Sequence, residues 1–143
     1  MRKVSIQRVE DLRWAKVGDI AQANARSTQA QSEVAELSQT DRDAGIIFHQ
    51  PGDDVTPQLF EVEYGPDARI ALHAHDEDEI MYVVAGEMRF GTEVLKPGSS
   101  VYIPGGAYYS FRTGSDGLRF LNFRPRADMT YHVRGGGAQK ANG

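Results

Sequence analysis

The chain has 143 residues, of which 40% are hydrophobic and 25% charged, a composition typical of one soluble domain with one core. It contains no cysteine, which excludes a disulfide framework, a thiolate metal site and a cysteine nucleophile. The net charge is −4 and there is no long basic stripe, so we expect no nucleic-acid partner. Residues 1–7 lack the apolar stretch of a signal peptide, and no run is long enough to span a bilayer. We therefore expect a cytoplasmic protein with no membrane partner.

Residues 1–44 differ in composition from the rest of the chain. Between residues 9 and 43 there is no proline, and Ala, Gln, Glu, Ser and Arg are frequent. The segment 27–37 is polar, with few apolar residues to anchor it. We expect an N-terminal arm of loops and short elements, anchored in part by Trp14. Because the arm is too polar to fold alone, it should pack on the main domain or on a partner subunit.

From Gly45 onwards the pattern favours many short strands. Segments rich in β-branched and aromatic residues alternate with Gly, Pro and Asp, which mark turns. One of these turns is expected at 114–117, between the last two strands. Turn residues recur so often after Gly45 that no room is left for helices, which predicts an antiparallel barrel or sandwich. The expected strands are 45–49, 58–64, 69–75, 79–90, 93–95, 100–103, 108–112 and 118–124.

A histidine–carboxylate cluster lies in the middle of the chain. His73 and His75 alternate on an expected strand, so both imidazoles point to the same face. Residues 76–78 are acidic and form a turn, after which Glu79 begins the next strand. Two imidazoles and one carboxylate are the ligand set of non-haem Fe(II) sites, and the same donors suit Zn, Mn, Ni or Co. The alternative is a solvated turn without a ligand.

The spacing of this cluster resembles the first motif of the cupin superfamily. That motif has a glycine, then His-x-His, a glutamate three or four residues later, and a glycine after six more. Here the corresponding residues are Gly65, His73, His75, Glu79 and Gly86. Gly65 lies two residues further from His73 than is usual, which is a difference of loop length.

The second cupin motif is present in its glycine–proline frame. The frame consists of Gly98, Pro104 and Gly106, but Tyr109 stands where the family usually has a histidine ligand, and Thr113 where it has an asparagine. The resemblance implies an all-β fold, a double-stranded β-helix (a jelly-roll or cupin barrel) over residues 45–133, with a partly irregular N-terminal arm. We expect residues 134–143 to form a flexible tail.

The resemblance also implies a pocket inside the barrel, lined by His73, His75 and Glu79 as metal ligands. Tyr109 would point into it as a catalytic acid or base, as a hydrogen-bond donor to substrate or as a further ligand, with Phe111 on the same face. The first hypothesis is a metal-dependent enzyme that acts on a small organic molecule, with dioxygenase chemistry most natural for iron and isomerase, lyase or cyclase chemistry as alternatives. The second is a non-catalytic cupin that has lost the metal and binds or senses a small ligand. The third is a structural cluster in a protein that acts through its surface.

Several other residues carry weaker expectations. His49 and His132 should be surface residues, and Asn122 should face the pocket or close a backbone hydrogen bond. Single-barrel cupins commonly dimerise, so the resemblance implies a homodimer. Four arginines on or near strands should lie at the solvent side, although one could meet an anionic substrate: Arg89, Arg112, Arg119 and Arg124.

Overall fold

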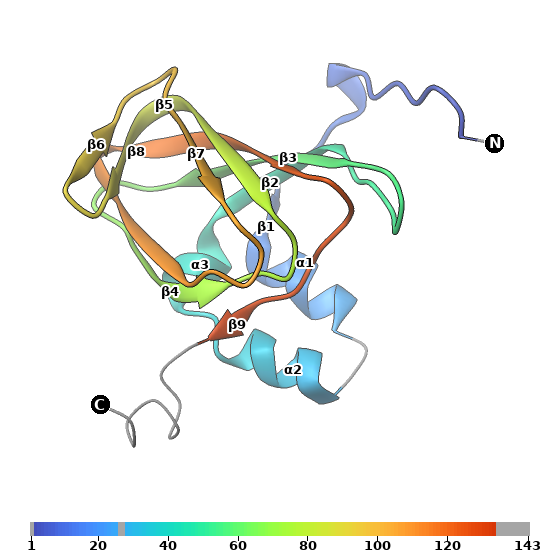
Figure 1. Cartoon of the computed structure of the whole chain (residues 1–143), viewed down its shortest axis with the longest axis horizontal. Coiled ribbons are helices and arrows are strands. Elements are labelled where there is room, and N and C mark those ends of the chain that lie inside the picture. Colours follow the sequence, from blue (N-terminus) through green and yellow to red (C-terminus); the bar gives the residue numbers. More distant parts are fainter. Residues whose placement is uncertain (1, 26–27, 134–143) are drawn as a thin grey trace.

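The computed structural model describes residues 2–25 and 28–133, which form an antiparallel barrel with helices packed on one side (Figure 1). The N-terminal part contains η1 (Val9–Asp11), β1 (Ala15–Lys16), α1 (Val17–Asn24), α2 (Thr28–Ala35) and α3 (Gln39–Asp43). The remaining elements are β2 (Gly45–Gln50), β3 (Gln58–Tyr64), β4 (Arg69–Ala74), β5 (Glu79–Phe90), β6 (Glu93–Leu95), β7 (Ser100–Ile103), β8 (Tyr109–Arg124) and β9 (His132–Val133).

Strand β8 pairs with three other strands of the sheet. It pairs antiparallel with β3, β4 and β5, while β5 also pairs with β6 and β7. The outer order runs β1-β2-β3-β8-β4-β9, so the first and last strands of the described residues, β1 and β9, are the outermost ones. Because one long strand contacts three others, the sheet rolls up around a common interior, as Figure 1 shows.

Side-chain alternation along β8 decides which residues reach this interior. Phe120, Asn122 and Arg124 are buried, whereas the residues between them face outwards. The same alternation on β5 buries Met81 and Val83 and leaves Tyr82 exposed. Most strand positions therefore match the pattern read from the sequence.

The expected turn at 114–117 is instead a bulge within one continuous strand. On β8, Thr113 and Leu118 pair with Met88 and Gly86 of β5, so β8 carries the extra residues while the ladder continues. Gly86 has φ 75°, and a Cβ there would lie 2.1 Å from the Gly117 carbonyl oxygen. This close approach explains why the position holds glycine.

The Thr113 hydroxyl stabilises the turn that follows β3 by hydrogen bonds. Its Oγ1 donates to the Gly65 carbonyl at 2.7 Å and accepts from the Ala68 amide at 2.8 Å. Thr113 stands where the second motif usually has an asparagine, and it bonds backbone groups of the turn that begins the first motif.

A second close approach of the backbone occurs at Gly105, where a Cβ would lie 2.2 Å from the Asp76 carbonyl oxygen.

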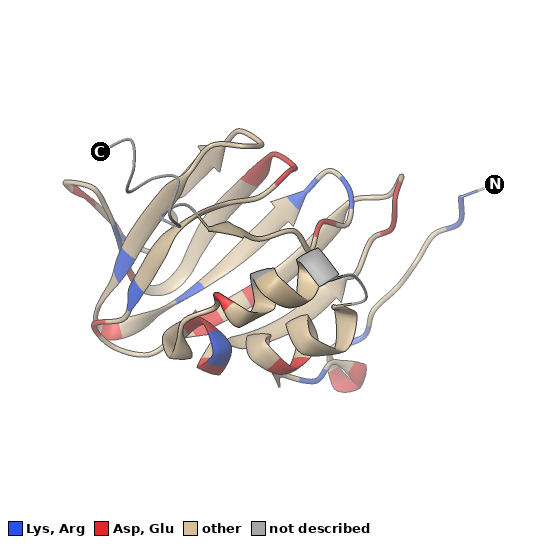
Figure 2. Cartoon of the chain, turned by 90° about the horizontal axis from the view of Figure 1, so that it is seen from below, with Lys and Arg blue, Asp and Glu red and all other residues tan. Residues whose placement is uncertain are grey.

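The N-terminal arm is more regular than the sequence indicated. Instead of loops, it contains α1, α2 and α3, which lie together on one side of the barrel (Figures 1 and 2). Ser38 caps α3 by accepting a hydrogen bond from the Asp41 amide at 3.1 Å, and the buried side chains of Val34 and Leu37 supply the apolar anchors. Trp14 packs against Gly45 and is 45% exposed.

Lys and Arg lie at separate places along the described ribbon and form no basic stripe (Figure 2). Within the described ranges, no helix has the length and apolar character needed to cross a membrane. The tail predicted at 134–143 lies outside the described residues.

Candidate functional site

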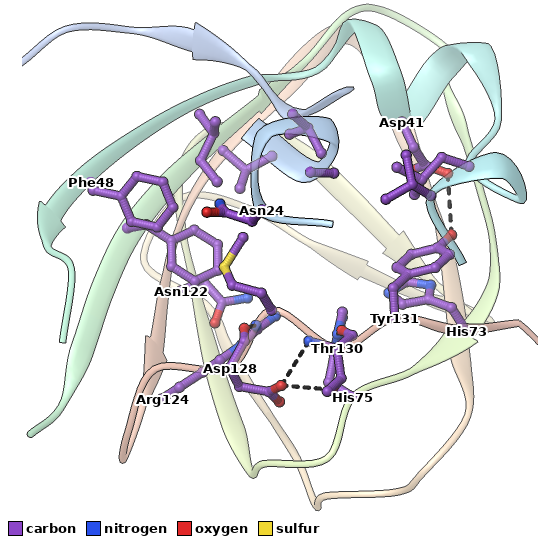
Figure 3. Close-up of a pocket in the computed structure, with 18 of the residues that line it drawn as sticks. Asn24, Asp41, Phe48, His73, His75, Asn122, Arg124, Asp128, Thr130 and Tyr131 are labelled. Carbon is purple, nitrogen blue, oxygen red and sulfur yellow. Dashed lines mark hydrogen bonds between the residues drawn. The ribbon is translucent and has the colours of Figure 1, made fainter. Parts of the chain in front are cut away.

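A cavity of about 170 Å³ lies between the barrel interior and the helices of the arm (Figure 3). Most of its wall is apolar. The arm contributes Val17, Ala21, Val34 and Leu37. The barrel contributes Ile46, Phe48, Phe60, Val62, Phe111 and Phe120. A polar group gathers at the other side, from β4, β8 and the segment before β9: His73, His75, Tyr109, Asn122, Arg124 and Thr130.

Both predicted histidines line this cavity, with ring centroids 4.9 Å apart. The Nδ1 atom of His73 is 2.7 Å from the Ala71 carbonyl oxygen, and that of His75 is 2.5 Å from the Thr130 carbonyl oxygen. A carbonyl can only accept, so each Nδ1 carries the proton and each Nε2 keeps its lone pair when the ring is neutral.

Burial keeps both rings neutral. It lowers the pKa of His73, and together with the nearby Arg124 charge it lowers the pKa of His75 to about 4. His75 keeps a partly exposed surface because it lines the cavity. At neutral pH both histidines are therefore acceptors at Nε2.

Glu79 is bound to a buried arginine. Arg124 donates from Nη2 and Nε to Oε2 of Glu79, at 3.0 and 3.3 Å, and from Nη1 to the Asp128 carbonyl. Its guanidinium also lies 5.0 Å from the centre of the Phe60 ring. Burial alone would raise the pKa of Glu79, but the charge of Arg124, with the hydrogen bond from Asn122, outweighs it and lowers the pKa. Glu79 is therefore an ionised carboxylate whose charge is balanced by the Arg124 guanidinium.

Tyr109 occupies the place that the sequence predicted. It pairs in register with His73, and the centres of the two rings are 4.5 Å apart. Burial, then the charge of Glu79, raises the pKa of the Tyr109 phenol well above its usual value. The phenol is therefore protonated at neutral pH. It lies close enough to the Glu79 carboxylate to perturb both pKa values, but no hydrogen bond of acceptable geometry reaches Oε1 of Glu79.

Two buried acceptor atoms have no partner among the described residues. They are Oε1 of Glu79 and Oδ1 of Asn122, whose side chains are 1% and 3% exposed. Asn122 donates from Nδ2 to Oε2 of Glu79 at 3.0 Å. Buried polar groups are nearly always hydrogen-bonded, so two unpaired acceptors beside a cavity indicate the absence of a donor that the site is built to receive.

The segment before β9 closes the site against the arm. Tyr131 stacks on His73 and donates to Asp41 of α3 at 3.3 Å, and Tyr64 donates to the other oxygen of Asp41 at 3.1 Å (Figure 3). Thr130 donates to Asp128 from both its amide and its hydroxyl. These contacts hold the carbonyl that fixes the His75 ring.

The residues present fit a metal ion only in part. In favour, three atoms have lone pairs that could bind a metal: Nε2 of His73, Nε2 of His75 and Oε1 of Glu79. Each histidine is also oriented by a backbone carbonyl, as metal-ligating histidines are. Against this, Arg124 already neutralises the carboxylate. In addition, no three His, Asp or Glu side chains among residues 2–25 and 28–133 are grouped to hold an ion.

Other predictions had mixed outcomes. His49 bonds Glu61 at 3.0 Å and His132 bonds Asp76 at 2.7 Å, both outside the cavity and partly exposed. The expectation that the strand arginines lie at the solvent side is wrong for Arg124, which is 5% exposed. Asp41 was missed, although the Ser38-x-x-Asp41 spacing marks a helix start; its contacts with the two distant tyrosines leave no local signal. Arg124 could have been found, since alternation from Phe120 places it inside.

Residues 60–123 match the model of the "Cupin domain" family. An RmlC-like cupin from Ralstonia eutropha JMP134 is 12% identical, with TM-score 0.62 over 91% of this chain and 79% of that one. The polyketide cyclase RemF from Streptomyces resistomycificus is 23% identical, with TM-score 0.54 over 69% and 78%. An oxalate decarboxylase variant from Bacillus subtilis is 18% identical, with TM-score 0.52 over 61% of this chain but only 26% of that one. No curated protein matches the chain in sequence. At these identities the likeness concerns the fold, and it confirms the barrel.

Proposed function

The chain belongs to the cupin superfamily, and from that premise we propose that its function is to bind a small organic molecule in the barrel cavity. The fold alone does not set the activity, so the proposal depends on the site. The cavity combines a broad apolar wall with a compact polar group at one side, which is the usual composition of a small-molecule site.

The buried ion pair between Glu79 and Arg124 is the observation that carries this proposal. In a metal centre built on His73, His75 and Glu79, the ion would supply the positive charge that balances the carboxylate. Here the guanidinium supplies it, with Nη2 3.0 Å from Oε2. A divalent ion on the other carboxylate oxygen would lie close to a fixed positive charge in a region of low dielectric, which is unfavourable.

A metal-dependent enzyme is the second candidate function. It is favoured by the free Nε2 atoms of His73 and His75 and by the unpaired Oε1 of Glu79. These three residues would hold the ion, Fe(II) before Zn, Mn, Ni or Co, and such an ion would supply Lewis-acid or oxygen chemistry to the bound molecule. Tyr109, held protonated by its raised pKa, would then donate a hydrogen bond to the bound molecule.

Elemental analysis of protein purified without added metal separates the two candidates. We expect less than a tenth of an equivalent of any first-row metal, and no rise in melting temperature when Fe(II), Mn(II), Ni(II), Co(II) or Zn(II) is added. A stoichiometric metal that is lost in the His75→Ala variant would overturn the proposal in favour of the metal centre. Arg124→Met is the matched variant: if the guanidinium excludes the ion, removing it should increase metal uptake.

We also propose a homodimer formed through the outer face of β5, β7 and β8. Ile80 of β5 pairs with Tyr102 of β7 and Phe123 of β8, and the three side chains are 40–59% exposed in one row. Exposed apolar rows of this kind favour burial against another surface. Sedimentation velocity should give a dimer for the wild type and a monomer for the Tyr102→Lys/Phe123→Lys variant. A wild-type monomer would contradict the proposal.

A further inference from the structure

The polar side of the cavity has more acceptors than donors. Asn122 shows this most clearly, because its orientation is determined by its neighbour. Glu79 is ionised and can only accept, so Nδ2 must face Oε2, and Oδ1 is left pointing away without a partner. Oε1 of Glu79 is also unpaired, but Glu79 does not line the cavity, so it is not counted as an acceptor for a ligand.

The two histidines add acceptors of the same kind. Each uses its Nδ1 proton on a backbone carbonyl, at 2.7 Å for His73 and 2.5 Å for His75. With the proton on Nδ1, the Nε2 atom of each ring is left with a lone pair. No hydrogen bond within the described part of the chain reaches either Nε2.

Most donors nearby are already in use. All three guanidinium nitrogens of Arg124 donate, two to Glu79 and one to the Asp128 carbonyl. The hydroxyl of Thr130 donates to Asp128, and that of Tyr131 donates to Asp41. The Tyr109 phenol and the Asn24 amide are the other donors that line the cavity. An anionic ligand would therefore meet more lone pairs than free donors. An ammonium ligand would lie near the fixed positive charge of the Arg124 guanidinium, which is unfavourable.

The volume and the wall of the cavity limit the rest of the ligand. The cavity measures about 170 Å³, and an engineered cavity of roughly 150 Å³ in another protein is enough for benzene. Phe48 and Phe60, with ring centroids 5.6 Å apart, and Phe111 and Phe120, with centroids 5.9 Å apart, supply aromatic faces and edges. A ligand of about one ring can contact these side chains while a substituent reaches Asn122.

Resting on the proposed function, we infer that the ligand is a neutral, ring-sized alcohol or phenol whose hydroxyl donates to the acceptor cluster at Asn122, His73 and His75. The hydroxyl proton satisfies a buried acceptor that the protein leaves unpaired. The ring replaces water at the apolar wall.

Three probes of similar size test the inference: phenol, anisole and benzoate. Anisole keeps the ring and the oxygen but lacks the donor, and benzoate carries a charge. Binding is measured by titration calorimetry and by NMR shifts, with a chelator present to remove metal. We expect phenol to bind at least tenfold more tightly than anisole, and benzoate to bind more weakly than both. Asn122→Leu should reduce the preference for phenol over anisole to less than threefold, while Ser110→Leu, exposed on the outside of the same strand, should leave it unchanged.

The outcomes separate this inference from the proposal on which it rests. If anisole binds as tightly as phenol, or benzoate more tightly, the donor inference is overturned while the small-molecule pocket stands. If none of the three binds to the wild type, both are overturned. The comparison of probes uses the wild-type chain alone, so it remains decisive even if Asn122→Leu does not fold.

Discussion

Replacing Arg124 with methionine tests whether the guanidinium is what keeps Glu79 charged inside the barrel. Methionine preserves much of the apolar stem but removes two hydrogen bonds to Oε2 and one to the Asp128 carbonyl. Removing one partner of a buried ion pair typically costs about 3–5 kcal/mol, because the other charge is left without compensation. The lost contact with Phe60 adds a few tenths to about 1 kcal/mol. We expect the free energy of unfolding to fall by about 4 kcal/mol at pH 7.

Urea denaturation followed by fluorescence and circular dichroism measures this loss. The matched control is Arg119→Met on the same strand, since Arg119 pairs with Glu61 at 2.6 Å but its side chain is 44% exposed. An exposed pair contributes roughly 0–1 kcal/mol, so the control should lose no more than that. The double variant Glu79→Gln/Arg124→Met should be more stable than Arg124→Met alone, because it removes the uncompensated charge.

The pH dependence of the Arg124→Met loss gives a second readout. Without the guanidinium, burial raises the folded-state pKa of Glu79 above its unfolded value, so the folded variant binds the proton more readily. Lowering the pH from 7 towards 5 should therefore shrink the loss. A loss equal to that of Arg119→Met, or a loss independent of pH, would refute the assignment of Arg124 as the counter-charge.

Three further predictions concern other parts of the site and the barrel. The folded-state pKa of His75 is about 4 against an unfolded value near 6.5, so this residue should account for up to about 3 kcal/mol of the stability that the wild type loses between pH 7 and 4, and His75→Gln should show a shallower fall in urea titrations. Gly86→Ala should lower the free energy of unfolding by more than about 2 kcal/mol, since its Cβ would overlap the Gly117 carbonyl; a loss near 1 kcal/mol would contradict the contact. Asp41→Ala should cost about 2–3 kcal/mol and speed proteolysis within residues 17–43, because two tyrosine hydroxyls lose their acceptor; unchanged cleavage would argue against the contact.

The strands were predictable because their signal is local. Alternation and turn residues gave β3, β5, β6 and β7 with the bounds observed. The error at 114–117 has a physical cause: glycines mark both turns and bulges, and only the pairing of Thr113 and Leu118 with β5 distinguishes them.

The site was predictable only in part. His73, His75 and Tyr109 line the cavity as expected, because strand periodicity alone puts them on one face. Arg124 was misjudged because isolated arginines usually face solvent, and its partner Glu79 lies 45 residues away. The metal ligation predicted for His73, His75 and Glu79 remains a prediction.

The arm was the least predictable part. Its helices are short and its sequence is polar, so local propensity is weak, and their packing depends on contacts with distant strands.

Asp41 connects segments that are far apart in the chain. It accepts from Tyr64, 23 residues away, and from Tyr131, 90 residues away. Closing so long a loop carries an entropic cost, so this junction should form late in folding and open before the barrel does. The contact between α3 and the segment before β9 then sets the local stability of this side of the cavity. Entry and release of a ligand would follow the opening of that contact, while the barrel strands stay paired.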